Sequence, residues 1–187
     1  MKTALLIVDI QNDYFPGGRM VLDGAVEASL NAAALLSAFR GLKLPLVHVR
    51  HVSKHAGATF FLPGSEGAEI HKSVAPLTGE TVIEKNYPNS FRQTELLEHL
   101  RKGQIERLVI AGMMTHMCID TTTRAACDLG FDLQLAHDAC ATKSLSFGGV
   151  EVPASLVHNA YIAALDGTFA KAMRSEDLIA ALAPKQS

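Results

Sequence analysis

Three residues of types that carry out nucleophilic catalysis, Asp9, Lys85 and Cys118, lie far apart in the sequence. Each stands at or just beyond the end of a short apolar run of the kind that forms a buried β-strand. Because ligands in open α/β sheets bind outside the carboxyl ends of the strands, we expect the three side chains to meet at one edge. A carboxylate there can accept a thiol proton, and an ammonium can stabilise the resulting thiolate nucleophile.

Cys118 lies in a turn between an apolar run at 107–110 and a helical run that begins near Asp120. Backbone N–H groups and the helix dipole favour negative charge at such a helix start. The position therefore predicts a thiolate at Cys118, with nearby backbone amides able to hold an oxyanion. A lone cysteine at a helix start is more often inert, so it is the convergence with Asp9 and Lys85 that favours catalysis.

The elements that would position these residues alternate between strand and helix. Continuous apolar or β-branched runs predict strands at 5–8, 44–49, 81–84, 107–110 and 131–136, with a short sixth strand at 168–170. Apolar periodicity and glycine stops predict helices at 25–40, 93–101, 115–129 and 152–165, and a last helix from Ser175. This alternation implies right-handed crossovers and a parallel sheet with helices on both faces, in the α/β class.

Composition narrows the class of protein. The 187 residues are 48% hydrophobic and 19% charged, which predicts a single globular domain over 1–187. A net charge of −2 gives no basic footprint for nucleic acid or an anionic membrane, and no apolar run reaches the roughly 18 residues of a membrane helix. The opening run reads as a strand rather than a signal peptide. Three cysteines without metal-ligand spacing suggest a reducing, cytoplasmic location.

Four segments resemble motifs of the isochorismatase-like cysteine hydrolases, a superfamily that includes nicotinamidases and N-carbamoylsarcosine amidases. They are 5–15 (LLIVDIQNDYF), 84–91 (EKNYPNSF), 111–122 (AGMMTHMCIDTT) and 138–142 (DACAT). The resemblance implies a three-layer, Rossmann-like fold with a six-stranded parallel sheet and an Asp9–Lys85–Cys118 triad. It also implies a cis peptide between Met113 and Met114, with the N–H groups of Met114 and Cys118 forming the oxyanion hole.

The predicted reaction is hydrolysis of a small amide-type C–N substrate through a thioester on Cys118. Asp9 would act as general base and then acid, Lys85 would stabilise the thiolate, and no cofactor is expected. True isochorismatases characteristically lack the cysteine, so Cys118 favours amide-type chemistry. An ether hydrolase stays an alternative, as does a catalytically idle small-molecule-binding scaffold. A nucleotide binder is disfavoured, because neither a G-x-G-x-x-G nor a Walker-type motif follows the first strand.

The histidines near the end of the second predicted strand can be compared with the metal motif of nicotinamidases, an Asp-x-His with a further His after the second strand. Residues 48–55 contain His48, His51 and His55 but no aspartate, and Arg50 and Lys54 would repel a cation. We therefore predict no metal site in this region.

Four residues are candidates for substrate contact because they lie beside the triad positions or in long loops: Phe15, Phe61, Tyr87 and His116. The loop 53–77 contains an apolar stretch at 60–63, which we expect to line the site or to pack on a second subunit. Members of the superfamily often assemble, so a homo-oligomer is expected. Cys127 should face away from Cys118 and be buried, and Cys140 should be structural. The pocket-forming loops 13–24, 53–77 and 143–150 leave the substrate open.

Overall fold

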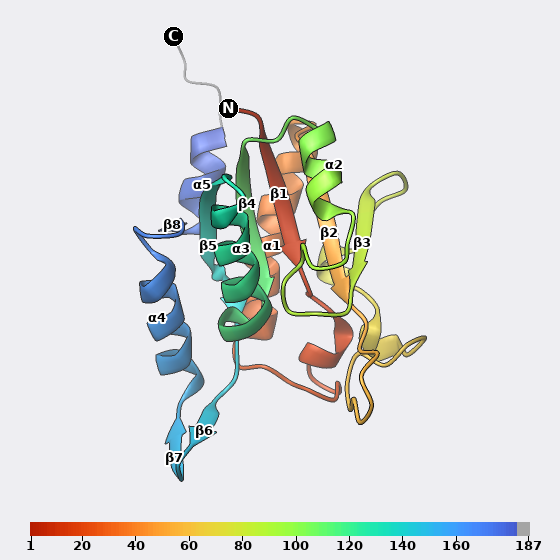
Figure 1. Cartoon of the computed structure of the whole chain (residues 1–187), viewed down its shortest axis with the longest axis vertical. Helices are drawn as coiled ribbons and strands as arrows, with labels where there is room; N and C mark the ends of the chain where they lie inside the picture. Colours follow the sequence, from red (N-terminus) through yellow and green to blue (C-terminus); the bar gives the residue numbers. More distant parts are fainter. Residues whose placement is uncertain (183–187) are drawn as a thin grey trace.

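Six parallel strands form the centre of the molecule (Figure 1), in the order β3-β2-β1-β4-β5-β8. The structure is a computed structural model that describes residues 1–182. The strands are β1 (Thr3–Val8), β2 (Leu46–His51), β3 (Thr81–Lys85), β4 (Arg107–Met113), β5 (Asp132–Ala141) and β8 (Lys171–Met173). The helices are α1 (Ala25–Gly41), α2 (Leu96–Lys102), α3 (Asp120–Asp128), α4 (Ala154–Leu165) and α5 (Ser175–Leu182). The predicted six-stranded α/β architecture is confirmed.

Both faces of the sheet are covered, which explains why β1 is apolar at every position from Ala4 to Val8. Leu5 and Ile7 pack in a core shared with α1 and α5. Leu6 and Val8 pack on the opposite face, in a core shared with α2, α3 and α4. A strand that is buried on both sides has no polar alternation, as is usual for central strands of parallel sheets.

Strand register aligns the carboxyl ends that carry the predicted site. Val8 pairs with Val49 on one side and with Gly112 on the other, and His51 pairs with Lys85 at the end of β2 and β3. The residues that follow β1, β3 and β4 therefore emerge at one edge of the sheet. In Figure 1 this is the lower edge, beneath β1, β2 and β4.

The predicted sixth strand is displaced by three residues: β8 spans Lys171–Met173 instead of 168–170. The chain first makes a tight turn, in which the Gly167 N–H donates to the Ala170 carbonyl and Gly167 has a φ of 74°. Asp166 then accepts a hydrogen bond from the Ala172 N–H at 2.9 Å. This turn uses up the residues that the apolar pattern assigned to the strand.

Two other regions differ from the expectations. Residues 143–150, expected as loop, contribute to a hairpin of β6 (Leu145–Phe147) and β7 (Val150–Val152). Its two turn residues, Gly148 and Gly149, both have positive φ, as the favoured two-residue hairpin turns require. The helix expected at 115–129 begins as a π-helical segment, Thr115–Ile119, before α3 starts.

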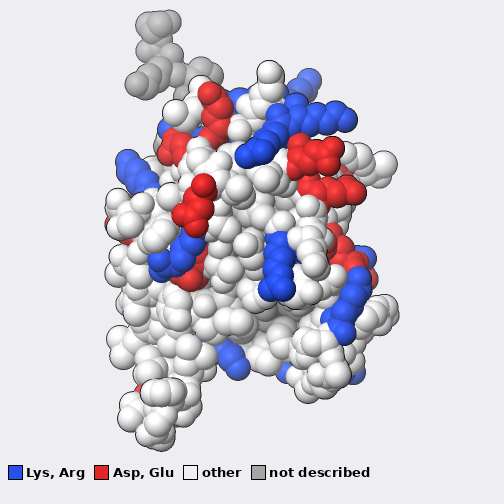
Figure 2. Space-filling view, in the orientation of Figure 1, with Lys and Arg blue, Asp and Glu red and all other residues white. Residues whose placement is uncertain are grey.

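The surface carries mixed charge. Figure 2 shows acidic and basic side chains close together on the upper and right-hand parts of one face, whereas the β6–β7 hairpin at the lower end is almost uncharged. Among the helices of residues 1–182, none has both the length and the hydrophobicity to cross a membrane.

Candidate active site

The structure brings Asp9, Lys85 and Cys118 together at the lower edge of the sheet. The Lys85 ammonium nitrogen lies 2.7 Å from Asp9 Oδ2 and 3.2 Å from Cys118 Sγ. The two charged side chains are fully buried, and Cys118 is 6% exposed. Isolated charges are costly to bury, so this arrangement is tenable only because the ammonium and carboxylate compensate each other.

Asp9 is held in an unusual backbone conformation directly after β1. Its φ is 53°, in the left-handed region that few residues other than glycine occupy. The Asp9 N–H still donates to the Val49 carbonyl at 2.9 Å, which keeps the residue tied to β2. Strain of this kind persists where the surrounding structure enforces it, and it concentrates at functional sites.

Gly112 allows β4 to approach β1 closely beside Asp9. A Cβ atom at this position would lie 1.9 Å from the Val8 carbonyl oxygen, and Gly112 has a φ of 142°. The pairing of β4 with β5 also shifts register between Ile110 and Gly112. Only glycine fits here, and the irregular register redirects the end of β4 toward the site.

Cys118 is presented by the turn that follows β4. The Met113–Met114 peptide bond is cis, and Met114 precedes the π-helical segment in extended conformation. The Ile119 N–H donates to the Met114 carbonyl at 3.2 Å, which closes the wide turn around Cys118. Single π-helical turns of this kind are frequent at functional sites.

Lys85 is surrounded by more acceptors than it has protons. Besides Asp9 and Cys118, its ammonium contacts His51 Nδ1 and the Tyr87 carbonyl oxygen, each at 3.0 Å. Burial lowers the pKa of Lys85, but the Asp9 carboxylate and Cys118 outweigh it, so that the pKa lies above its usual value. Lys85 is therefore a permanent cation at the centre of the site.

The surroundings of Cys118 favour the thiol, whereas its position at a helix start predicted a thiolate. Burial raises its pKa, the Asp9 carboxylate raises it further, and Lys85 lowers it too little to compensate. The helix-start argument considered the positive potential alone, whereas in the folded protein the desolvation and the adjacent carboxylate dominate. Any attack by Sγ must therefore be coupled to removal of its proton.

The same cluster contains metal-ligand types but is already occupied by a cation. Asp9, His51 and Cys118 each place one ligand atom within 4.8 Å of the others. The Lys85 ammonium contacts all three, so a metal ion there would have to displace it. The other two histidines of 48–55 lie elsewhere: His48 is buried against Glu80 at 3.1 Å, and His55 is exposed.

Of the four predicted substrate contacts, Phe61 and Tyr87 lie near the triad. Phe61 is 1% exposed with its ring 6.0 Å from that of His51, and the Tyr87 carbonyl accepts from Lys85. The loop 53–77 therefore lines the site through Phe61. His116 lies two residues before Cys118 and hydrogen-bonds Thr142.

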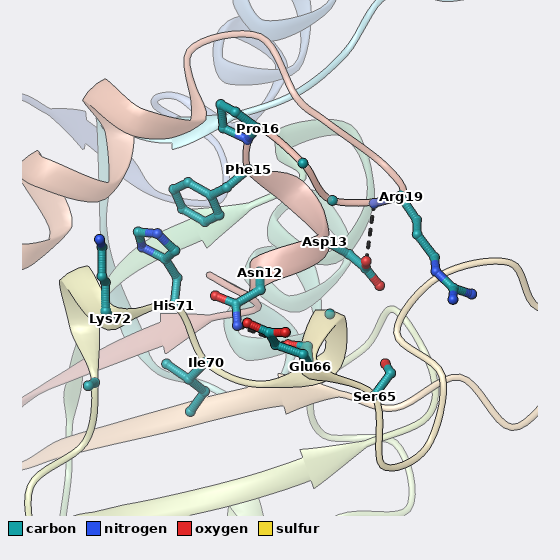
Figure 3. Close-up of a pocket in the computed structure, with 14 residues that line it drawn as sticks. Asn12, Asp13, Phe15, Pro16, Arg19, Ser65, Glu66, Ile70, His71 and Lys72 are labelled. Atoms are coloured by element: carbon teal, nitrogen blue, oxygen red, sulfur yellow. Dashed lines mark hydrogen bonds between the residues drawn. The ribbon is translucent and has the colours of Figure 1, made fainter.

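Phe15 faces another part of the molecule. Its ring stacks on that of His71, with centroids 3.6 Å apart, beside an open cavity of about 790 Å³ (Figure 3). The other two cysteines, Cys127 and Cys140, lie outside the triad. Cys140 is buried and donates to the Ala136 carbonyl, whereas Cys127 is half-buried, more open than expected.

The carboxylate of Asp13 lines this cavity and is held by two loops. Its Oδ1 accepts from the Arg19 N–H at 3.1 Å, the contact drawn in Figure 3, and its Oδ2 accepts from the Phe61 N–H at 2.6 Å. Gly67 leaves room for it, because a Cβ there would lie 2.2 Å from Oδ1. Asp13 thus joins the loop after β1 to the loop that carries Phe61.

Two residues at the site were not predicted from the sequence. Tyr14 is 1% exposed and meets Phe61 edge-on at 4.6 Å; burial raises its pKa, and the nearby Asp9 and Asp13 carboxylates raise it further. His51 contacts Lys85. The available signal was register: His51 and Lys85 end two adjacent parallel strands and pair directly.

Comparison with known proteins agrees with this geometry. Residues 3–177 match the profile of the Isochorismatase domain. The chain is 49% identical to the uncharacterized isochorismatase family protein YddQ of Bacillus subtilis, over 94% of this chain and 98% of that one. It is 31% identical to maleamate amidohydrolase of Pseudomonas putida, over 70% of this chain and 68% of that one.

A solved structure shows the same architecture. A crystal structure from Oleispira antarctica, described as that of a candidate isochorismatase hydrolase, superposes with a TM-score of 0.92 at 50% identity, covering 96% of each chain. The family match spans nearly the whole chain, and amidohydrolases are among its relatives. The protein therefore belongs to the isochorismatase family of hydrolases.

Proposed function

We propose that this protein is a cysteine amidohydrolase that cleaves a small amide-type C–N bond. The observation that carries the proposal is the buried Lys85 ammonium, which contacts both the Asp9 carboxylate and the Cys118 sulfur. A structural ion pair would need no thiol at its third corner. The arrangement supplies a nucleophile, a proton acceptor and a fixed positive charge within one enclosed space.

In the first half of the reaction, Sγ of Cys118 attacks the substrate carbonyl carbon while its proton passes to Asp9. The Sγ–C bond forms, and the electron pair of the C=O bond moves to oxygen. The N–H groups of Met114 and Cys118 would hold this oxyanion. The tetrahedral species then collapses, the C–N bond breaks, and Asp9 returns the proton to the leaving nitrogen.

In the second half, water attacks the thioester and gives a proton to Asp9. The C–S bond breaks, the carboxylic acid leaves, and the sulfur recovers its proton from Asp9. Lys85 compensates the negative charge that moves between sulfur and carboxylate in both halves. Because its surroundings favour the thiol, Sγ must lose its proton as it attacks the substrate.

The rival functions use less of the site. An ether hydrolase of the isochorismatase type needs no sulfur nucleophile. It would leave unused the Cys118 sulfur, which lies 3.2 Å from the Lys85 ammonium. An idle binding scaffold would keep a lysine, an aspartate and a cysteine buried together at a cost in free energy without using them. Maleamate amidohydrolase, a relative at 31% identity, bears a name that implies amide cleavage.

The test is turnover of a panel of small amides, carbamoyl compounds and lactams, followed as released ammonia or carboxylate. Cys118→Ala should abolish turnover and leave the melting temperature within a few degrees of the wild type. Cys127→Ala, which alters a half-buried thiol outside the site, is the matched control and should stay active. Turnover that survives in Cys118→Ala would refute nucleophilic catalysis by this residue.

A further inference from the structure

We infer that His51 binds the substrate, donating a hydrogen bond from Nε2–H to an acceptor atom on the carbon next to the scissile carbonyl. The enzyme should therefore prefer amides that carry such an acceptor, such as 2-oxo amides, over plain aliphatic amides. This inference rests on the proposed function and names the substrate class of the same site.

The contact with Lys85 determines which ring nitrogen carries the proton. An ammonium has only donors, so His51 Nδ1, which faces Lys85 Nζ at 3.0 Å, cannot carry a hydrogen that points at it. Nδ1 is then the acceptor, and the ring hydrogen lies on Nε2. Burial, followed by the charge of Lys85, lowers the pKa of His51 to about 4, so the ring is neutral at physiological pH.

The backbone of His51 is held by the side chain of Gln11. The buried side chain of Gln11 accepts from the His51 N–H at 2.7 Å and donates to the His51 carbonyl at 2.8 Å. It also donates to the Ala68 carbonyl at 2.7 Å, which ties His51 to the loop that carries Phe61. With Phe61 beside the ring, His51 has little freedom to turn away.

The second ring nitrogen of His51, Nε2, is free to bind a ligand. Within residues 1–182 it has no hydrogen-bond partner, and the residue is only partly buried. A ring nitrogen of His51 lies within 4.8 Å of Cys118 Sγ. A substrate carbonyl carbon bonded to Sγ therefore places its neighbouring atoms within reach of the imidazole. A polar donor on the ring beside the nucleophile, with no partner among the described residues, rewards a substrate that supplies an acceptor.

The experiment compares pyruvamide with propanamide, which differ by one carbonyl group beside the amide. Wild type, His51→Phe and His51→Gln are assayed for kcat and KM with both. Intrinsic reactivity is the same for every enzyme, so a change in the pyruvamide-to-propanamide ratio of kcat/KM isolates the residue. We expect His51→Phe to reduce this ratio about ten- to a hundredfold. His51→Gln, which keeps an N–H donor of similar reach, should recover part of it.

A binding measurement separates this inference from the proposed function. Calorimetry of the product analogues pyruvate and propanoate needs no turnover. The wild type should bind pyruvate more tightly, and His51→Phe should lose that difference while keeping its fold by circular dichroism. An unchanged pyruvate-to-propanoate difference in His51→Phe would overturn the role of His51 whether or not amides are cleaved. Loss of turnover in all variants with the binding difference intact would instead count against the proposed function alone.

Discussion

The open cavity beside Phe15 and His71 and the triad around Cys118 differ in how far their charged groups are buried. The cavity measures about 790 Å³; its charged residues Arg19, Glu66 and Lys72 are solvent-exposed, whereas Asp13 is buried. Around Cys118 the ionisable groups Asp9 and Lys85 are buried and pair with one another. Exposed charges are solvated and cannot shift one another's protonation, whereas the buried groups do so strongly. We therefore expect the chemistry at the buried groups and not in the larger cavity.

The largest effect should come from removing the cation of the enclosed site. Lys85→Met leaves the buried Asp9 carboxylate without compensation, which should destabilise the fold by about 3–5 kcal/mol. Loss of the fixed positive charge should also lower kcat/KM about 10²–10³-fold. Urea unfolding and steady-state kinetics measure the two effects. A variant with wild-type stability and activity would show that the ammonium is not essential to either.

Asp9→Asn should separate thiol reactivity from turnover. The carboxylate raises the pKa of Cys118, so its removal should lower that pKa, and each unit of the fall increases the thiolate fraction about tenfold. Alkylation of Cys118 by iodoacetamide at pH 8 should therefore become faster, although amide turnover is lost with the proton acceptor. Peptide mass spectrometry follows the rate, with Cys127 as the internal reference. Slower alkylation in the variant would contradict the electrostatic account.

A smaller effect is expected at Asp13, which joins the loop after β1 to the loop that carries Phe61. Asp13→Asn replaces one acceptor with a donor that faces a backbone N–H, of Arg19 or of Phe61, which should cost about 1–3 kcal/mol. Loosening Phe61 should raise KM more than it lowers kcat. Asp23→Asn, at an exposed aspartate, is the matched control for urea unfolding and kinetics. If both variants behave alike, Asp13 does not hold Phe61 in place.

The open cavity should give the smallest response. Lys72→Met makes the same chemical change as Lys85→Met, but at an exposed side chain that lines the cavity. Exposed substitutions change stability by about 0.5 kcal/mol or less, and kcat/KM should remain within twofold. A tenfold loss of kcat/KM would mean that the cavity takes part in substrate binding. The comparison between the open cavity and the buried triad would then be wrong.

The sequence predicted the sheet and the meeting of three residues because both depend on local patterns. Buried parallel strands are continuously apolar, and the carboxyl ends of parallel strands share one edge, so Asp9, Lys85 and Cys118 could be brought together without any side-chain detail. The displacement of β8 followed from a turn whose hydrogen bonds, such as that from Ala172 to Asp166, have no signature in an apolar pattern.

The protonation of the site was beyond local reasoning. Whether Cys118 rests as thiol or thiolate depends on a balance between burial, Asp9 and Lys85, which requires distances in three dimensions. His51 was missed as a site residue for a similar reason. Its role depends on which ring nitrogen meets Lys85, and on Gln11, a residue forty positions away that fixes its backbone.

The most direct test of the account is capture of the covalent intermediate. Wild-type protein is mixed with an amide that it turns over, quenched in acid within milliseconds to seconds, and analysed by intact and peptide mass spectrometry. We predict an added mass equal to the acyl group, located on the peptide that contains Cys118, and absent when water has completed the reaction or when the protein is Cys118→Ala. Sustained turnover with the acyl group on another residue, or activity of Cys118→Ala equal to the wild type, would contradict the account.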